Sequence, residues 1–235
     1  MVHIVATGAG KDMMDRRDDP THEYILSLTG KSRPRVLFVG TATGDRPDYI
    51  VSFYQTYHSD RCAPHHLPLF NRDRDDLRSW ITDFDVIHVG GGNTANMYDV
   101  WRRQGVWQIL TDMFNDPANE NVVFTGGSAG GICWFDGGTT DSFGPTLQVL
   151  PEGLGFVSGS FSPHYDAEGQ RRPLVHAALL AGELGEGWAC GNLDSLHFNG
   201  GELVEAISTA IEPMALTLSV ENGAVVETPL PVRAL

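Results

Sequence analysis

The chain has 235 residues, of which 41% are hydrophobic and 20% charged, and its 30 acidic against 16 basic residues give a net charge of −14. This composition is typical of a globular protein, and the length suits a single domain over residues 1–235. The negative charge disfavours a nucleic-acid partner, and no apolar run is long enough to predict a membrane span. The cysteines are sparse and the N-terminus does not resemble a signal peptide, so we expect a cytoplasmic protein.

Short apolar runs alternate with amphipathic stretches along most of the chain. Strands that are separated by helices and read as continuous apolar runs favour an α/β fold, with a doubly wound, mostly parallel sheet flanked by helices. The expected strands are His3–Ala6, Val36–Val39, His66–Phe70, Val86–Val89, Val122–Thr125 and Gly155–Ser158, and the expected helices include Tyr49–Tyr57, Asp75–Asp83 and Thr94–Phe114.

The segment LTLSVENGAVVETPL near the C-terminus has a different pattern. It holds two extended runs on either side of Asn222-Gly223, and Asn-Gly is a strong signal for a two-residue hairpin turn. We therefore predict a C-terminal β-hairpin that closes an edge of the sheet.

Three glycine-containing turns follow three of the predicted parallel strands. They are VGTATGD after Val39, VGGGNT after Val86 and TGGSAGG after Val122. Ligands of open α/β sheets bind beyond the carboxyl ends of the strands. We therefore expect the three turns to gather at one rim and to form the site there.

Ser128 lies in a G-x-S-x-G sequence that runs from Gly126 to Gly130. This pattern is typical of a sharp turn between a strand and a helix that exposes a nucleophilic serine. The alternative is a glycine-rich loop in which the serine only caps a helix. The place of this turn at the predicted rim favours the nucleophile.

A nucleophilic serine needs a base and donors for the oxyanion. Of nine histidines, His164 follows an apolar strand in the loop sequence FSPHYDAEGQ, so it could reach Ser128 or be an ordinary loop histidine. The N–H of Ala129 and the bare backbone of Gly90–Gly92 are candidate donors, although the three glycines also suit a simple tight turn. No motif calls for a cofactor, and we expect no metal.

The sequences VGGGNT, GGSAGGICWFDGGTTDSFG and SPHYDAEGQRRP form an ordered set that resembles the peptidase E family of serine peptidases, which includes cyanophycinases and aspartyl dipeptidases. The resemblance runs through nearly the whole chain. It implies a fold related to class I glutamine amidotransferases, with Ser128 as the nucleophile and His164 as the base. It also implies that Gly92 and Ala129 supply the backbone donors of the oxyanion hole.

The third catalytic residue is implied within ACGNLDSLHF, where family members carry a carboxylate or sometimes an asparagine. Alignment on LHF places Asn192 in this position, and Asp194 is the alternative if the stretch is extended. An asparagine can accept a hydrogen bond from the histidine and fix its tautomer, but it adds no charge. We therefore expect a weaker catalytic group than a carboxylate would give.

The resemblance implies hydrolysis of dipeptides with an N-terminal aspartate, whose side-chain carboxylate needs a cation. Arg171 and Arg172 match a basic stretch of the family, and their alternative role is a charge pair on a helix surface. Glu168 is a candidate for the free amino group. Asp141 is a supporting or pocket residue, or else only a turn residue.

Two other functions remain open. A cyanophycinase-like enzyme would hydrolyse β-linked aspartyl-arginine, and it would need acidic residues in the pocket to bind the arginine. A weakly active family member with a binding role is also consistent with Asn192. In each case the expected partner is a small peptide, with no membrane, and the protein is expected to be a monomer or a homodimer.

Overall fold

The structure is a computed structural model, and it describes residues 1–9 and 18–235. In chain order its elements are β1 (His3–Thr7), α1 (Pro20–Ser27), β2 (Arg35–Val39), η1 (Thr41–Thr43), α2 (Pro47–Thr56), β3 (Ala63–His66), α3 (Leu77–Ile81), β4 (Val86–Val89), α4 (Thr94–Gln104), α5 (Val106–Asn115), η2 (Pro117–Asn119), β5 (Val123–Gly127), α6 (Ala129–Ile132), β6 (Phe135–Thr140), β7 (Gln148–Leu150), β8 (Val157–Ser162), α7 (Arg171–Ala181), β9 (Gly187–Cys190), β10 (Asp194–Asn199), β11 (Glu202–Ser208), β12 (Ala215–Glu221), β13 (Ala224–Pro229) and β14 (Val232–Ala234).

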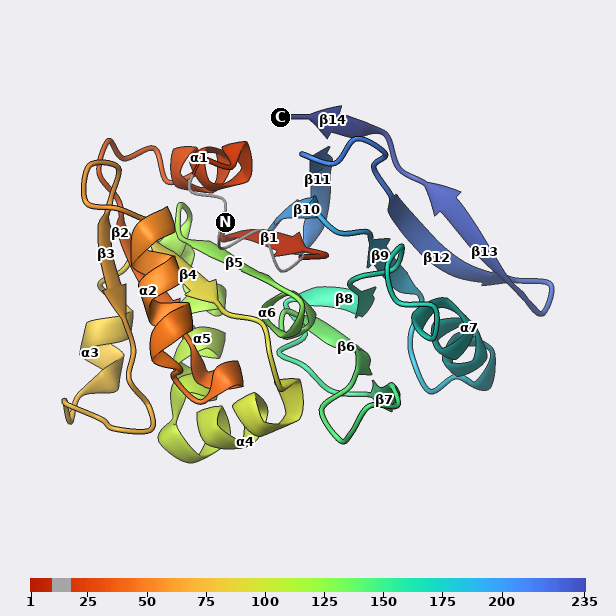
Figure 1. Ribbon diagram of the computed structural model, residues 1–235, viewed down its shortest axis with the longest axis horizontal. Helices are drawn as coiled ribbons and strands as arrows, with labels where there is room; N and C mark the ends of the chain where they lie inside the picture. Colours follow the sequence, from red (N-terminus) through yellow and green to blue (C-terminus); the bar gives the residue numbers. More distant parts are fainter. Residues whose placement is uncertain (10–17) are drawn as a thin grey trace.

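The strands form two sheets with helices around them (Figure 1). Within the described residues, the larger sheet has eight strands in the order β14-β11-β10-β1-β5-β4-β2-β3, and the smaller has six in the order β13-β12-β9-β8-β6-β7. The run β1-β5-β4-β2-β3 is parallel throughout, whereas β10 and β11 extend it in antiparallel pairing. The predicted α/β fold, with sheets flanked by helices, is confirmed.

Helices cover both faces of the parallel strands. Val36 and Phe38 of β2 belong to a hydrophobic cluster that includes side chains of α1 and α2, while Leu37 and Val39 belong to a cluster that includes α3, α4 and α5. Because neighbouring residues of a strand point to opposite faces, this division is the doubly wound arrangement. None of the helices in the described ranges combines the length and apolarity that a membrane crossing requires.

The carboxyl ends of β2, β4 and β5 lie at one edge of the larger sheet. Val39 is aligned with Val89, and Val89 is aligned with Gly126, so the turns after these three strands are neighbours. The Asn93 N–H donates a hydrogen bond of 2.8 Å to the Ala42 carbonyl, which joins the first two turns directly. The predicted gathering of the three turns is therefore present.

The smaller sheet packs against the larger one on one side and against α7 on the other. Phe135 of β6 stacks on Phe161 of β8, with 4.8 Å between ring centroids, and meets Phe198 of β10 edge-on at 5.6 Å. On the opposite side, Val175 of α7 belongs to a cluster with Leu216 of β12. This packing holds the loop after β8 and the start of α7 beside the larger sheet.

The C-terminal hairpin is formed by β12 and β13, with Asn222 and Gly223 at its turn (Figure 1). It lies at the edge of the smaller sheet, because β12 pairs with β9. The sequence analysis placed it on the parallel sheet, and that expectation was wrong. The strands β6, β8 and β9 belong to a separate sheet that was not predicted from the sequence, and the hairpin strand β12 pairs with β9 of this sheet.

Some boundaries also differ from the expected ones. The long helix expected over Thr94–Phe114 is broken by Gly105, which has a φ of 79° and separates α4 from α5. The strand expected at His66–Phe70 ends at His66, and Pro68 has no N–H with which to continue the pairing. The strand expected at Gly155–Ser158 begins only at Val157, because Gly155 has a φ of 67° and turns the chain.

Candidate active site

Ser128 lies in the turn between β5 and α6, and its backbone is strained. Its φ of 55° and ψ of −118° fall in a region that few residues other than glycine adopt. The surrounding packing requires small residues, because a Cβ added at Gly130 would lie 2.1 Å from the Val89 carbonyl oxygen. The short helix α6 can therefore lie directly on β4, and the turn presents Ser128 at the rim of the sheet.

A cavity of about 800 Å³ lies at this rim. Ser128, His164 and Asn192 all line it, together with the triple-glycine turn. The remaining lining residues come from several parts of the fold, among them α2, the strand β4 and the loop before α7: Ala9, Phe38, Asp48, Tyr49, Ser52, His88, Val89, Asn93, Gly127, Asp141, Ala167, Glu168 and Arg171. A volume of this size is ordinary for a small-molecule or peptide site.

His164 lies in the loop after β8, and its backbone is also strained, with a φ of 53°. Its carbonyl oxygen accepts hydrogen bonds of 3.1 Å from the N–H groups of Ala167 and Glu168, which fix the loop. Its Nδ1 lies 2.8 Å from Oδ1 of Asn192. If the amide oxygen accepts this bond, Nδ1 carries the proton and Nε2 is free to act as a base.

Asn192 and Asp194 point in different directions. Leu193 between them has a φ of 67°, so the stretch turns and is not extended. Oδ2 of Asp194 accepts the Met214 N–H at 2.8 Å, and the residue is buried at the start of β10. Burial raises the pKa of this carboxyl. The residue in contact with His164 is therefore Asn192.

The triple-glycine turn lies against the serine. A Cβ added at Gly91 would lie 3.3 Å from the Ser128 Cβ and 4.0 Å from its Oγ. Gly92 has a φ of 134°, and a Cβ there would lie 2.4 Å from the Ala42 carbonyl oxygen, so only glycine fits. The backbone of Gly92 lines the cavity beside Ser128, and Ala129, the first residue of α6, follows the serine directly in the chain.

Arg171 is the first residue of α7, and it is buried beneath the cavity. Its Nη1 donates to the carbonyl and hydroxyl oxygens of Thr139 at 2.7 and 2.9 Å, while Nη2 and Nε lie 2.5 and 3.0 Å from a carboxylate oxygen of Glu168. Burial lowers the pKa of this guanidinium, and Glu168 opposes the effect. Arg171 is thus a fixed cation in the cavity wall, partly neutralised by Glu168.

The structure places Arg172 outside the cavity. Its Nε lies 3.0 Å from Oε1 of Glu227 on the C-terminal hairpin, and its guanidinium lies 4.9 Å from the centre of the Tyr165 ring. The two neighbouring arginines therefore differ completely: Arg171 faces the cavity, and Arg172 joins α7 to the hairpin.

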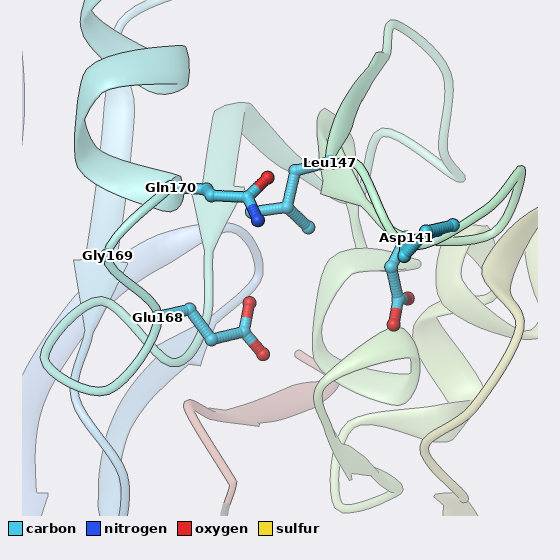
Figure 2. Close-up of a pocket in the computed structure, with 6 residues that line it drawn as sticks. Asp141, Leu147, Glu168, Gly169 and Gln170 are labelled. Carbon is cyan, nitrogen blue, oxygen red and sulfur yellow. The ribbon is translucent and has the colours of Figure 1, made fainter.

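Asp141 directly follows β6 and lines the cavity, as Glu168 does. These two acids also line a smaller side pocket of about 230 Å³, which opens beside the main cavity (Figure 2). Figure 2 shows their carboxylates on opposite sides of this pocket. The side pocket is completed by Pro145, Leu147, Gly169 and Gln170. Its chemistry suits a positively charged group.

The sequence analysis missed the wall of the cavity that α2 and its neighbours form. Asp48, Tyr49 and Ser52 of α2 line it, with His88 on β4 behind them. His88 is buried, its Nδ1 lies 3.1 Å from the Tyr57 hydroxyl, and burial lowers its pKa to about 3. It is therefore a neutral imidazole. A histidine inside the apolar strand VIHV was the signal that could have identified this residue.

His58, Cys62, His65 and His66 lie close together in the sequence and are of residue types that bind metals, but they form no metal site in the part of the chain that is described. No group of three His, Cys, Asp or Glu side chains converges there in a geometry for an ion. His66 lies 2.9 Å from the Tyr54 hydroxyl, and Cys62 is buried.

Comparisons with known proteins identify the family of the chain. Residues 4–206 match the model of peptidase family S51. The chain is 38% identical over 235 residues to an uncharacterized peptidase, YgaJ, of Bacillus subtilis (strain 168), and the match covers 100% of both chains.

Two solved structures share the fold at low sequence identity. A peptidase from an acI-B1 Actinobacterium is 14% identical with a TM-score of 0.65, over 97% of each chain. A protein assigned as a peptidase E candidate, from Listeria monocytogenes EGD-e, is 15% identical with a TM-score of 0.62, over 89% of this chain and 100% of that one. With the family match over most of its length, the chain belongs to peptidase family S51 and is a serine-type peptidase.

Proposed function

We propose that this peptidase hydrolyses short peptides with a free amino terminus, and Asp-X dipeptides above others, through an acyl-enzyme on Ser128. The observation that carries the proposal is the shared cavity, which is lined by Ser128 in its strained turn and by the hydrogen-bonded pair His164 and Asn192. A serine at the end of a strand, a histidine with a bonded Nδ1 and bare backbone beside the serine are the parts that acyl transfer requires.

The first step is attack by the Ser128 hydroxyl oxygen on the scissile carbonyl carbon. Nε2 of His164 accepts the hydroxyl proton, and the oxyanion binds the N–H groups of Ala129 and Gly92. The proton then passes from Nε2 to the leaving amine as the C–N bond breaks. In the second half of the reaction, water attacks the ester carbonyl while Nε2 of His164 accepts a proton from it. Nε2 then donates this proton to the Ser128 oxygen as the ester bond breaks.

Asn192 keeps the imidazole of His164 in the tautomer that exposes Nε2, since its Oδ1 lies 2.8 Å from Nδ1. It offers the imidazolium no negative charge, unlike the aspartate of the usual triad. We therefore expect a lower kcat than a carboxylate in this position would give.

The preference for an N-terminal aspartate rests on the charges around the cavity. Arg171 lines it, and its planar guanidinium suits a carboxylate. Glu168 and Asp141 also line the cavity, and their carboxylates suit the α-ammonium group of the same residue. An N-terminal aspartate carries both charges within one residue, which matches this mixed set.

The acidic side pocket favours a second candidate function. Asp141 and Glu168 line a space of about 230 Å³, and although Glu168 is paired with Arg171, the carboxylate of Asp141 suits the guanidinium of a β-aspartyl-arginine substrate. This substrate would use the same nucleophile and base. The two candidates differ in the bond that is cleaved, which is the α-peptide bond of Asp-X or the β-linked amide of β-Asp-Arg, and in which charge of the substrate decides binding.

The test is a panel of Asp-Leu, N-acetyl-Asp-Leu, Glu-Leu, Ala-Leu and β-Asp-Arg, assayed with the wild type, Ser128→Ala, Arg171→Met and Arg172→Met. We expect Asp-Leu to be the best substrate and Ser128→Ala to lose about 10³-fold or more in kcat. Arg171→Met should lose about 100-fold in kcat/KM for Asp-Leu and little for Ala-Leu.

Arg172→Met is the matched control, because this neighbouring arginine bonds Glu227 outside the cavity. It should retain the wild-type preference. Cleavage of β-Asp-Arg in preference to Asp-Leu would favour the second candidate. Equal rates for Asp-Leu and Ala-Leu would refute the aspartate preference, and full activity of Ser128→Ala would refute the mechanism.

A further inference from the structure

Asp166 lies two residues after His164 and contacts the residue that orients it. Its Oδ1 accepts the backbone N–H of Asn192 at 2.9 Å. Asn192 in turn contacts Nδ1 of His164 through its side chain at 2.8 Å. The three residues thus form a closed ring. The backbone links His164 to Asp166, one hydrogen bond links Asp166 to Asn192, and a second links Asn192 to His164.

This ring depends on the glycine before Asn192. A Cβ added at Gly191 would lie 2.8 Å from Oδ2 of Asp194 and 3.1 Å from Oδ2 of Asp166, so a larger residue there would displace these carboxyl groups. The turn is also fixed from outside, because the Gly191 N–H donates to the Met214 carbonyl at 2.7 Å and the Tyr165 N–H donates to the Cys190 carbonyl at 3.0 Å.

Among the described residues, the titratable side chains beside this turn include those of Asp166, Asp194 and Cys190. Burial raises the pKa of the Asp194 carboxyl, and the charge of Asp166 acts in the same direction. Burial also raises the pKa of the Cys190 thiol, which stays neutral. Asp166 is exposed and in contact with water. Of these two acidic residues, Asp166 is therefore the exposed one and Asp194 the buried one.

We propose that Asp166 is a positioning residue of the active site, whose carboxylate fixes Asn192 and supplies, one hydrogen bond further out, the negative charge that the asparagine lacks. The proposal rests on the proposed roles of Ser128 and His164. A carboxylate near an imidazole favours the protonated ring. That ring is the form of His164 present when the oxyanion forms, so the charge of Asp166 stabilises the transition state more than the ground state.

Two substitutions separate position from charge. Asp166→Asn keeps an oxygen that can accept the Asn192 N–H and removes only the charge, whereas Asp166→Ala removes both. Asp136→Asn is the matched control, because Oδ2 of Asp136 accepts the Gly159 N–H at 2.8 Å at an exposed position on β6. It removes an equal charge and alters a similar bond.

With Asp-Leu as substrate, we expect Asp166→Asn to lower kcat about threefold and to move the midpoint of the acidic limb of the pH–rate profile down by about half a pH unit. Asp166→Ala should lower kcat about tenfold or more. Asp136→Asn should leave both quantities at wild-type values. A purely structural role would lower kcat without moving the midpoint, and that result would overturn the proposed charge effect.

A second measurement does not need peptide hydrolysis. The pH at which the NMR signals of the His164 ring change can be followed in the wild type, Asp166→Asn and Asp136→Asn. We expect a lower transition only in Asp166→Asn. Absence of dipeptide cleavage by the wild type would refute the proposed function and leave this test standing, whereas an unchanged transition in Asp166→Asn would refute the role of Asp166.

A double-mutant cycle adds a third criterion. Asn192→Asp places a carboxylate directly on His164, after which the charge of Asp166 is redundant. Asp166→Asn should therefore cost less kcat in the Asn192→Asp background than in the wild type. An equal loss in both backgrounds would show that the two positions act independently and would contradict the proposal.

Discussion

Gly130→Ala tests whether the position of Ser128 depends on the close approach of α6 to β4. The added methyl carbon would lie 2.1 Å from the Val89 carbonyl oxygen and 2.7 Å from its carbonyl carbon, so the gap must widen to about 3.4 Å for ordinary contact. The obstacle is backbone in the centre of the larger sheet, which cannot rotate away. The helix α6 must therefore move by roughly 1 Å or more, and such overpacking costs about 3 kcal/mol in stability.

Helix propensity opposes this effect only weakly, because Gly→Ala favours a helix by about 1 kcal/mol. We therefore expect the free energy of unfolding to fall by about 2 kcal/mol in urea titrations. A shift of Ser128 by about 1 Å should also lower kcat about 100-fold.

The control for Gly130→Ala is Gly185→Ala, where a Cβ would meet only the Gly159 Cα at 3.7 Å. This variant should match the wild type in both stability and kcat. If Gly130→Ala were as stable and active as the wild type, the packing of α6 would not determine the position of the nucleophile, and the reasoning would be refuted.

Two further predictions concern the cavity and the sheet. Gly91→Ala places a methyl carbon 4.0 Å from the Ser128 Oγ, in space that a substrate carbonyl needs. We expect kcat/KM to fall about 100-fold while the midpoint of urea unfolding changes little. An unchanged kcat/KM would contradict this prediction. Burial lowers the pKa of His197 to about 4, below its ordinary value of 6.5. The stabilisation that comes from keeping His197 neutral in the folded protein is therefore fully present above pH 6.5, and it is lost as the pH falls toward 4. His197→Gln should flatten the fall in unfolding free energy between pH 6.5 and 5, by up to about 1 kcal/mol per pH unit, and an unchanged slope would show that His197 does not cause it.

The features that the sequence predicted well are local ones. The strand, turn and helix around Ser128 follow from an apolar run and small residues within a few positions of each other, and no distant contact is needed to infer them. The parallel strands β1, β2, β4 and β5 have the same origin, because each is a continuous apolar run between turn residues.

The choice between neighbouring residues could not be made from sequence. Arg171 and Arg172 diverge because α7 begins at Arg171, and successive residues of a helix point about 100° apart. Gln170 before them makes no side-chain capping bond, so nothing in the sequence marks where the helix starts. Asn192 and Asp194 diverge because Leu193 has a φ of 67°, which is uncommon for a leucine.

The second sheet was missed for another reason. Its strands β6 and β8 read FDGGTT and VSGSFS, in which glycine and serine interrupt the apolar pattern. Their glycines are required by close backbone neighbours, since a Cβ at Gly138 would lie 2.5 Å from the Phe161 carbonyl oxygen. Such a contact joins distant parts of the chain. The α2 wall of the cavity was missed for the same reason, because it meets Ser128 only in the folded protein.

The central claim is that Ser128 is a nucleophile activated by His164, and covalent labelling tests it most directly. The wild type, Ser128→Ala and His164→Ala would be treated with a fluorophosphonate, and the adduct would be located by mass spectrometry of proteolytic peptides. We predict one adduct on Ser128 in the wild type, none in Ser128→Ala and at least about 100-fold slower labelling in His164→Ala. Equal labelling of the wild type and Ser128→Ala, or none in either, would contradict the account.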